Sequence, residues 1–343
     1  MCSLVMDRDM NSHTNSQMTN RAQNENSASQ SGAVSRMASI DIGTVTCRLL
    51  LADVSDTSFT ELERQVAITN LGIGVDKTHL LQDDAIDRAV TKISEYLAIV
   101  DNYKTVDHPE IPVVAVATSA SRDAKNSAVL VDCLREIGVE LRIIEGIQEA
   151  RLSFRGASRG YEGEQLLVAD IGGGSTELVL GLGGDIPRIS HSFNIGCRRM
   201  TERFMASNPP TDAECAQLRA CVREEMASYF TQAKEAGCAI ERIVAVAGTP
   251  TSVVAIDKHM EVYDSSRVHG TVVPRETLQR IYDNLRAIPL EERKGVVGLE
   301  PARASVIVAG LAILLEVLDL ADCSSFTVSE SDILQGILLS ERE

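Results

Sequence analysis

The sequence of 343 residues contains no tryptophan, and aromatic residues make up only 3% of it. Proteins that bind single-stranded nucleic acid stack the bases on aromatic side chains, so a surface of that kind is disfavoured. Positive charge is also scarce, because 33 Lys and Arg stand against 49 Asp and Glu, which gives a formal net charge of −16. We therefore expect no nucleic-acid partner. A polyanionic substrate would need a local positive site made by Mg²⁺, a few arginines or backbone amides.

The patterns that mark a zinc or redox site are missing. The eight cysteines include no Cys-x-x-Cys pair, and no cluster of histidines accompanies any of them. This spacing argues against zinc and thioredoxin-type sites and favours reduced thiols in a reducing compartment. The six histidines are scattered without ligand spacing, so we assign them no catalytic role.

No segment predicts a membrane span. The longest apolar stretch, residues 306–320, carries Glu316 and is shorter than the roughly 20 residues that a spanning helix needs. The first residues show no apolar signal-peptide segment. We expect a cytoplasmic protein with no membrane partner.

The residues that are present suffice for a folded protein of two domains. Apolar residues make up 44% of the chain, enough for a substantial core. Residues 1–36 are rich in Asn, Ser and Gln, which predicts a disordered tail. From residue 38 onward, short aliphatic runs alternate with longer amphipathic runs, as strands and helices do. Strands are predicted at 38–42, 46–54, 59–69, 112–117, 140–144, 166–170, 175–181, 187–194, 242–247 and 325–328. Helices are predicted at about 83–102, at 121–137, from about 145, and at 211–236, 302–318 and 331–342.

One stretch of the sequence occurs twice. Residues 41–51 and 170–180 align without a gap and share an Asp, an Ile, a Gly and two leucines. Each copy has the pattern of a strand that ends in Asp, a glycine turn and a second strand, and βα units follow each copy. Two α/β domains of related topology are therefore predicted. Such turns leave backbone N–H groups pointing into open space, so two turns facing each other would hold a phosphate chain.

Three turns are candidate phosphate-binding sites. The turn at 172–175 carries three consecutive glycines, which permit close approach of the backbone to a ligand, although a tight β-hairpin would need them too. The matching turn of the first copy and a strand-to-helix junction near residue 248 are the other two, and such junctions also occur without a ligand. The candidate residues are Gly43, Thr44, Gly172, Gly173, Gly174, Ser175, Gly248 and Thr249.

Charged residues near these turns are candidates for metal binding and catalysis. Asp41 and Asp170 each end a buried strand, where a carboxylate needs a metal ion, amides or an arginine; turn capping is the alternative. Glu177 lies in the strand after the second turn, where an outward-facing residue is the ordinary interpretation. Glu149 opens a helix and could take a proton from water, or favour the helix dipole. Arg122 follows a buried strand and could neutralise phosphate charge, or form a surface salt bridge.

Several ordered segments together resemble the exopolyphosphatase/guanosine pentaphosphate phosphohydrolase (Ppx/GppA) family, within the actin–sugar kinase–Hsp70 (ASKHA) superfamily. The resemblance runs from Ser39 to about Leu339, and the order and spacing of the segments are more specific than any one of them. The segments are 40–44, 117–124, 144–152, 170–177, 247–251, 303–310 and 328–330.

The resemblance implies an α/β fold of two related actin-like (ASKHA, RNase H-like) domains with an interdomain cleft. Domain I would span residues 37–147, closed by a C-terminal helix at 329–343, and domain II would span 148–328. We expect the chain to lack the C-terminal helical domain of the longer family members, which favours short polyphosphate or a nucleotide as substrate.

The resemblance also implies a role for each candidate. Glu149 corresponds to the catalytic base. Asp170 and Glu177 correspond to carboxylates that hold the metal ion and position the water, with Asp41 a further candidate ligand; Mg²⁺, or Mn²⁺, is the implied cofactor. Arg122 and the three turns correspond to the phosphate-binding residues.

Three positions depart from the family pattern. Gln148 and Ser305 stand where acidic residues are frequent, and Thr44 stands where Ser is frequent. The change at Thr44 keeps a hydroxyl group, and the change at Gln148 leaves the neighbouring base in place.

The implied function is that of a phosphoanhydride hydrolase, which releases terminal phosphate from inorganic polyphosphate or guanosine pentaphosphate (pppGpp). A homodimer is expected, because the family's members often dimerise. One alternative is an ATP-dependent kinase of the same superfamily, which would not need Glu149. The other is a sensor that binds polyphosphate or an alarmone without turnover, which would need neither Glu149 nor Glu177. Both substrates stay open at this point.

Overall fold

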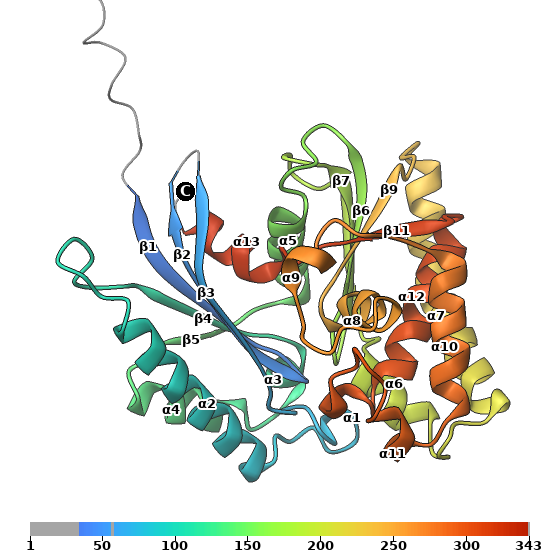
Figure 1. Ribbon diagram of the computed structural model, residues 1–343, viewed down its shortest axis with the longest axis horizontal. Helices are drawn as coiled ribbons and strands as arrows, with labels where there is room; N and C mark the ends of the chain where they lie inside the picture. Colours follow the sequence, from blue (N-terminus) through green and yellow to red (C-terminus); the bar gives the residue numbers. More distant parts are fainter. Residues whose placement is uncertain (1–33, 56–57, 342–343) are drawn as a thin grey trace, which may run out of the picture.

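The chain folds into two lobes, each built on its own β-sheet (Figure 1). The structure, a computed structural model, describes residues 34–55 and 58–341. Most of the predicted tail, residues 1–33, therefore lies outside the described residues. Lobe I holds a five-stranded sheet of β1 (Ser35–Ile42), β2 (Thr46–Val54), β3 (Phe59–Ile68), β4 (Val113–Ala117) and β5 (Leu141–Ile143). Lobe II holds a six-stranded sheet of β6 (Gln165–Ile171), β7 (Thr176–Leu182), β8 (Ile189–Phe193), β9 (Arg242–Val246), β10 (Val272–Pro274) and β11 (Ser325–Val328).

The two sheets repeat one topology. The order is β3-β2-β1-β4-β5 in lobe I and β8-β7-β6-β9-β11-β10 in lobe II. In each sheet the first three strands form an antiparallel meander, and the next strand joins the first one in parallel. Lobe II adds only β10 at its edge. The predicted α/β fold of two related actin-like domains is therefore confirmed.

The sequence repeat lies at the same place in both sheets. Asp41 pairs with Arg48 across β1 and β2, and Asp170 pairs with Glu177 across β6 and β7. Arg48 thus occupies in lobe I the position that Glu177 occupies in lobe II. The two equivalent positions therefore carry opposite charge, an arginine in lobe I and a glutamate in lobe II.

Helices cover both faces of the lobe I sheet. The amphipathic helices α2 (Asp83–Asp101) and α4 (Ser127–Glu136) pack on the outer face. The inner face is covered by α13 (Ile333–Ser340), because β1 and β2 are apolar on both sides and need a second layer. The residues of this inner layer include Leu50, Leu334 and Leu338 in one cluster and Val114, Ile333 and Ile337 in another.

Lobe II is layered in the same way. Its outer face is covered by α7 (Asp212–Glu235), α10 (Arg275–Ala287) and α12 (Ile307–Ala321), with α8 (Gly248–Asp257) beside them (Figure 1). Its inner face is covered by α5 (Gly146–Ala157), through Ala150 and Phe154. None of the helices in the described ranges combines the length and hydropathy that crossing a bilayer requires.

The inner helices α5 and α13 cross between the lobes (Figure 1). A Cβ on Gly156 would lie 1.8 Å from the carbonyl oxygen of Asp332, and a Cβ on Gly336 would lie 1.9 Å from that of Leu152. Real Cβ atoms do not approach a backbone so closely, so the crossing needs glycine on both helices. This crossing places the N-terminal turn of α5, with Glu149, at the junction of the lobes.

Two predicted boundaries are wrong. The first strand starts at Ser35, before the predicted end of the tail, and Arg36 bonds Asp53 of the neighbouring strand at 2.8 Å. The predicted helix 302–318 starts instead at Ile307, after the short 3-10 helix η1 (Pro301–Arg303).

The predicted helix 121–137 is also wrong, because the chain forms two helices there. The first is α3 (Ser119–Asp123), and the second is α4. Ala124 between them is extended, and the side chain of Asn126 bonds both the N–H and the C=O of Leu81. These contacts are long-range, so no local pattern indicated the break.

Several short elements lie where the sequence predicted none. They are α1 (Val75–Thr78), α6 (Cys197–Phe204), α9 (Ser265–Val268) and α11 (Leu290–Arg293), together with β10 and the longer α10.

Candidate active site

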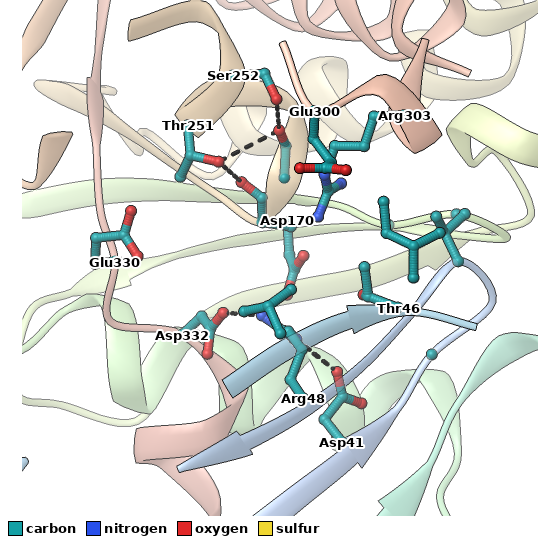
Figure 2. Close-up of a pocket in the computed structure, with 18 of the residues that line it drawn as sticks. Asp41, Thr46, Arg48, Asp170, Thr251, Ser252, Glu300, Arg303, Glu330 and Asp332 are labelled. Atoms are coloured by element: carbon teal, nitrogen blue, oxygen red, sulfur yellow. Dashed lines mark hydrogen bonds and ion pairs between the residues drawn. The ribbon is translucent and has the colours of Figure 1, made fainter. Parts of the chain in front are cut away.

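A cavity of about 920 Å³, here called the cleft, lies between the two lobes. Both glycine turns of the sequence repeat line it, together with the start of α8 and the residue before α13. Figure 2 shows side chains from both lobes pointing into this space. The charged residues of the lining are Asp41, Arg48, Glu61, Arg64, Glu149, Asp170, Glu261, Glu300, Arg303, Glu330 and Asp332.

The two glycine turns have the same geometry and touch each other. In each turn the N–H of the first glycine donates to the carbonyl three residues later, at 2.8 Å in lobe I and 3.0 Å in lobe II. A Cβ on Gly173 would lie 2.8 Å from the Cβ of Thr44, and a Cβ on Gly174 would lie 2.7 Å from Thr44 Oγ1. The glycines of the second turn therefore also serve packing, because they allow the lobes to meet at this point.

Three carboxylates are close enough to repel one another. Glu149 and Asp170 line the cleft, and Glu177 lies beside Asp170 on β7 with only 1% of its surface exposed. Burial raises the pKa of Glu149 to about 8 and the pKa of Asp170 to about 6. Burial, and then the charges of the other two, raise the pKa of Glu177 well above its usual value. The three groups together therefore favour binding of protons or of another positive charge.

Serine hydroxyls hold two of these carboxylates. Ser153 Oγ donates to Asp170 at 2.5 Å, and Ser192 Oγ donates to Glu177 at 2.7 Å. The second oxygen of Glu177 is buried without a partner. The ordinary interpretation of Glu177 as an outward-facing strand residue is therefore wrong.

Arg122 orients the third carboxylate. Its Nη1 donates to Glu149 Oε2 at 3.2 Å and to the carbonyl of Ile144 at 2.9 Å. The side chain does not belong to the lining of the cleft. In this structure Arg122 therefore bonds Glu149 from outside the lining of the cleft, and its predicted role in phosphate binding stays a prediction.

Arg48 carries no predicted role, yet it lies at the centre of the site (Figure 2). It donates to Asp41 Oδ2 at 2.7 Å from one nitrogen and 3.0 Å from another, and it forms an ion pair with Asp332. Asp41 therefore has an arginine partner, as its burial at the end of a strand requires. Its other oxygen is buried without a partner.

A second arginine, Arg303, packs against Gly248 in the third turn. A Cβ on Gly248 would lie 1.7 Å from Nη1 of Arg303, so the guanidinium covers this glycine. Arg303 points into the cleft, and no hydrogen bond or ion pair joins its side chain to the described residues (Figure 2). Burial lowers the pKa of this guanidinium. A partly buried cation without a side-chain partner is suited to an anionic ligand.

The third turn places its hydroxyl groups differently from the prediction. Thr249 is 3% exposed, and its Oγ1 would lie 2.4 Å from a Cβ on Gly310, so its side chain faces the interior of lobe II. Thr251 and Ser252, on the next turn of α8, line the cleft instead (Figure 2).

The donor set fits a divalent cation held partly by substrate. Among residues 34–55 and 58–341, no group of three or more His, Cys, Asp and Glu side chains is arranged to hold a metal ion. Asp41 Oδ1 and Glu177 Oε2 are nevertheless buried oxygens without partners, next to Asp170 with its raised pKa. Mg²⁺ commonly takes one or two carboxylates and completes its shell with water and phosphate oxygens.

Comparison with known proteins identifies the family. The profile of the Ppx/GppA phosphatase family matches residues 50–343. The chain belongs to the Ppx/GppA phosphatase family. It is 36% identical over 325 residues to exopolyphosphatase 2 of Mycobacterium tuberculosis, an alignment that covers 90% of this chain and 99% of that protein.

Solved structures of the Ppx/GppA family share the fold. The family member from Aquifex aeolicus is 32% identical with a TM-score of 0.74, covering 90% of this chain and 98% of that one. An exopolyphosphatase from Cytophaga hutchinsonii is 26% identical with a TM-score of 0.80, covering 89% and 97%. The family resemblance predicted from the sequence is therefore confirmed.

In this Ppx/GppA chain the cleft gathers most of the predicted residues. Those that line it are Asp41, Gly43, Thr44, Glu149, Asp170, Gly172, Gly173, Gly174, Ser175 and Gly248. Those outside the lining are Arg122, Glu177 and Thr249. Arg303 was missed although it opens one of the segments that carried the family resemblance; the signal for Arg48 was its place in the repeat, opposite Asp41.

Proposed function

We propose that this chain hydrolyses the terminal phosphoanhydride bond of inorganic polyphosphate. The observation that carries the proposal is a buried glutamate, Glu149, which lines a cleft shared with two glycine turns and an unpaired arginine. Similarity along nearly the whole chain to a protein named exopolyphosphatase 2 supports this substrate class.

Glu149 acts as the general base. It accepts a proton from a water molecule while the water oxygen forms a bond to the terminal phosphorus. The bond from that phosphorus to the bridging oxygen breaks, and the shortened chain leaves with the electron pair. Arg122 keeps the Glu149 carboxylate oriented. A cation bound beside Glu149 would lower its pKa from about 8 and so favour the ionised form that a base requires.

Asp170 and Glu177, with Asp41, are the residues that would hold Mg²⁺ or Mn²⁺. When bound, the cation would supply Lewis-acid stabilisation of the charge on the transferring phosphoryl group. The buried, unpartnered oxygens of Asp41 and Glu177 support this assignment.

The remaining phosphates would be bound by arginine and by turn amides. Arg48 already has two carboxylate partners, Asp41 and Asp332, whereas Arg303 has none among the described residues. Arg303 is therefore the cation that we expect to bind substrate phosphate. Eight acidic side chains and three arginines line the cleft, so a long polyanion would be repelled, which favours short chains.

Guanosine pentaphosphate is a second candidate substrate. Apolar residues also line the cleft, among them Met260 and Leu299, each 5% exposed, and Tyr263, which is 50% exposed. A polyphosphate chain has no use for apolar contacts, whereas a nucleobase would bury its faces against them.

The test compares phosphate release from polyphosphates of defined length and from guanosine pentaphosphate by wild type and Glu149→Gln. The matched control is Glu145→Gln, because Glu145 is the exposed residue just before the same helix. We expect release by wild type and the control, and loss of release in Glu149→Gln. Equal release by all three proteins refutes the base. Transfer from ATP to an acceptor that survives Glu149→Gln would favour the kinase alternative, and calorimetric binding without release would favour the sensor.

A further inference from the structure

Helix α6 holds the carbonyl side of the second glycine turn. The N–H of Cys197 donates to the carbonyl of Gly172 at 2.9 Å, and the N–H of Arg198 donates to that of Gly173 at 2.8 Å. In a trans peptide the N–H points opposite to the preceding carbonyl. These bonds therefore turn the N–H groups of the residues that follow away from α6 and toward the substrate side.

The side chain of Arg199 completes this set. Its Nε donates to the carbonyl of Gly174 at 2.7 Å, so all three glycine carbonyls of the turn are held by α6. The same guanidinium also donates to Ser119 Oγ at 3.3 Å, on the lobe I side of the cleft. Arg199 itself does not line the cleft, and its side chain is only 9% exposed.

Arg199 also forms ion pairs with lobe I. Its two Nη atoms bond the carboxylates of Asp76 in α1 and Asp123 in α3, which have 16% and 24% of their side chains exposed. Figure 1 shows α6 beside α1, where the two lobes meet. One guanidinium therefore joins the phosphate turn of one lobe to two carboxylates of the other.

We propose that Arg199 is a positioning residue that couples closure of the lobes to the geometry of the glycine turn. When the lobes are closed, Asp76 and Asp123 fix the guanidinium against the Gly174 carbonyl, and the turn amides point at the substrate. When the lobes separate, the guanidinium loses its anionic partners, and the turn loses one of its three restraints. This inference rests on the proposed function only in taking the turn to bind phosphate.

A neighbouring arginine provides the control. Arg203, one turn further along α6, also pairs with Asp76, at 2.7 Å, but has no bond to the glycine turn. Arg203→Gln therefore removes charge between the lobes and leaves the turn restrained, whereas Arg199→Gln removes both. A variant with both Asp76→Asn and Asp123→Asn leaves Arg199 in place and removes its two anionic partners in lobe I, together with the anionic partner of Arg203.

The experiment measures amide hydrogen exchange of Gly172, Cys197 and Arg198, whose N–H groups are bonded within or to the turn, without substrate. It also measures kcat and KM with polyphosphate. We expect exchange to rise about tenfold or more in Arg199→Gln and in the double Asp variant, with kcat falling by a similar factor and KM changing less. Arg203→Gln should change each quantity by less than about threefold, and Arg199→Lys should recover part of kcat.

Unchanged exchange in the double Asp variant would overturn the coupling, because the turn would then be independent of lobe I. Equal effects of Arg203→Gln and Arg199→Gln would overturn it as well, because only the overall charge between the lobes would matter. Exchange is measured without substrate, so it decides the matter even if wild type hydrolyses no polyphosphate. Circular dichroism of each variant separates these results from failure to fold.

Discussion

Replacing Glu149 with glutamine should slow hydrolysis and stabilise the protein at the same time. Glutamine keeps the shape of the side chain and can still accept the hydrogen bond of Arg122, but it cannot take a proton from water. A positioned general base contributes about 10²–10⁴-fold to rate, so we expect kcat to fall within that range while KM changes little.

The gain in stability follows from the raised pKa. Glu149 titrates at about 8 in the folded protein against an ordinary value of 4.5. Since the folded-state pKa is the higher one, the contribution of this group to the free energy of unfolding is present below about pH 4.5 and is lost as the pH rises through about 8. The loss is about 1.4 kcal/mol for each pH unit in between. Glutamine has no such loss.

The assay is urea unfolding of wild type, Glu149→Gln and Glu145→Gln at about pH 5 and about pH 8.5, without divalent cations. At the higher pH we expect Glu149→Gln to exceed wild type by about 2–4 kcal/mol, or roughly 3–6 °C in Tm, with little difference at the lower pH. The control should follow wild type. A difference that does not grow with pH would refute the reasoning, because the buried carboxyl group would then have an ordinary pKa.

Three further predictions follow from the cleft and the helix crossing. Arg303→Gln should lower kcat/KM by about 10–100-fold and raise Tm, because a partly desolvated cation without a side-chain partner is removed. Steady-state kinetics and calorimetry measure the two quantities, and a variant with unchanged kcat/KM and a lower Tm would contradict the prediction. Chelation of divalent cations should abolish phosphate release. Added Mg²⁺ should shift the rising limb of the pH–rate profile of wild type to lower pH. A profile insensitive to Mg²⁺ would exclude a cation beside Glu149. Gly336→Ala should destabilise the protein by about 2 kcal/mol or more in urea unfolding, since the new Cβ would lie 1.9 Å from the carbonyl of Leu152. Gly295→Ala, whose Cβ would have its nearest neighbour at 3.4 Å, is the matched control, and equal losses for both would contradict the crossing.

Much of the fold could be predicted because its signals are local. Strands such as β4 and β6 are short aliphatic runs, and the repeat of residues 41–51 at 170–180 predicted two sheets of one topology. The predictions of helix boundaries failed where long-range contacts decide where a helix begins or ends. The break at Ala124 depends on Asn126 bonding a loop 45 residues away in the chain. Helix α6 starts at Cys197 without a side-chain cap, and its first N–H groups are satisfied by the glycine turn.

The candidate site, like the fold, was predicted in part. Glu149 and Asp170 were placed by the motifs of the family resemblance, and the structure brings both to one cleft. Arg48 and Arg303 were missed, although the repeat and the family segments contained them, since their charge partners across the cleft depend on the tertiary structure. The predicted homodimer stays a prediction.

The amino-acid sequence by itself determined the two-lobed topology, the glycine turns and the acidic residues beside them, because apolar periodicity and glycine act over a few neighbouring residues. Only the tertiary structure decided which charges face each other: Arg48 between Asp41 and Asp332, Arg303 alone over Gly248, and Arg199 between the two lobes. The physical reason is that the pKa of a carboxyl group and the partner of an arginine depend on burial and on distances across the cleft. Those quantities exist only once the inner helices have crossed and the lobes have met.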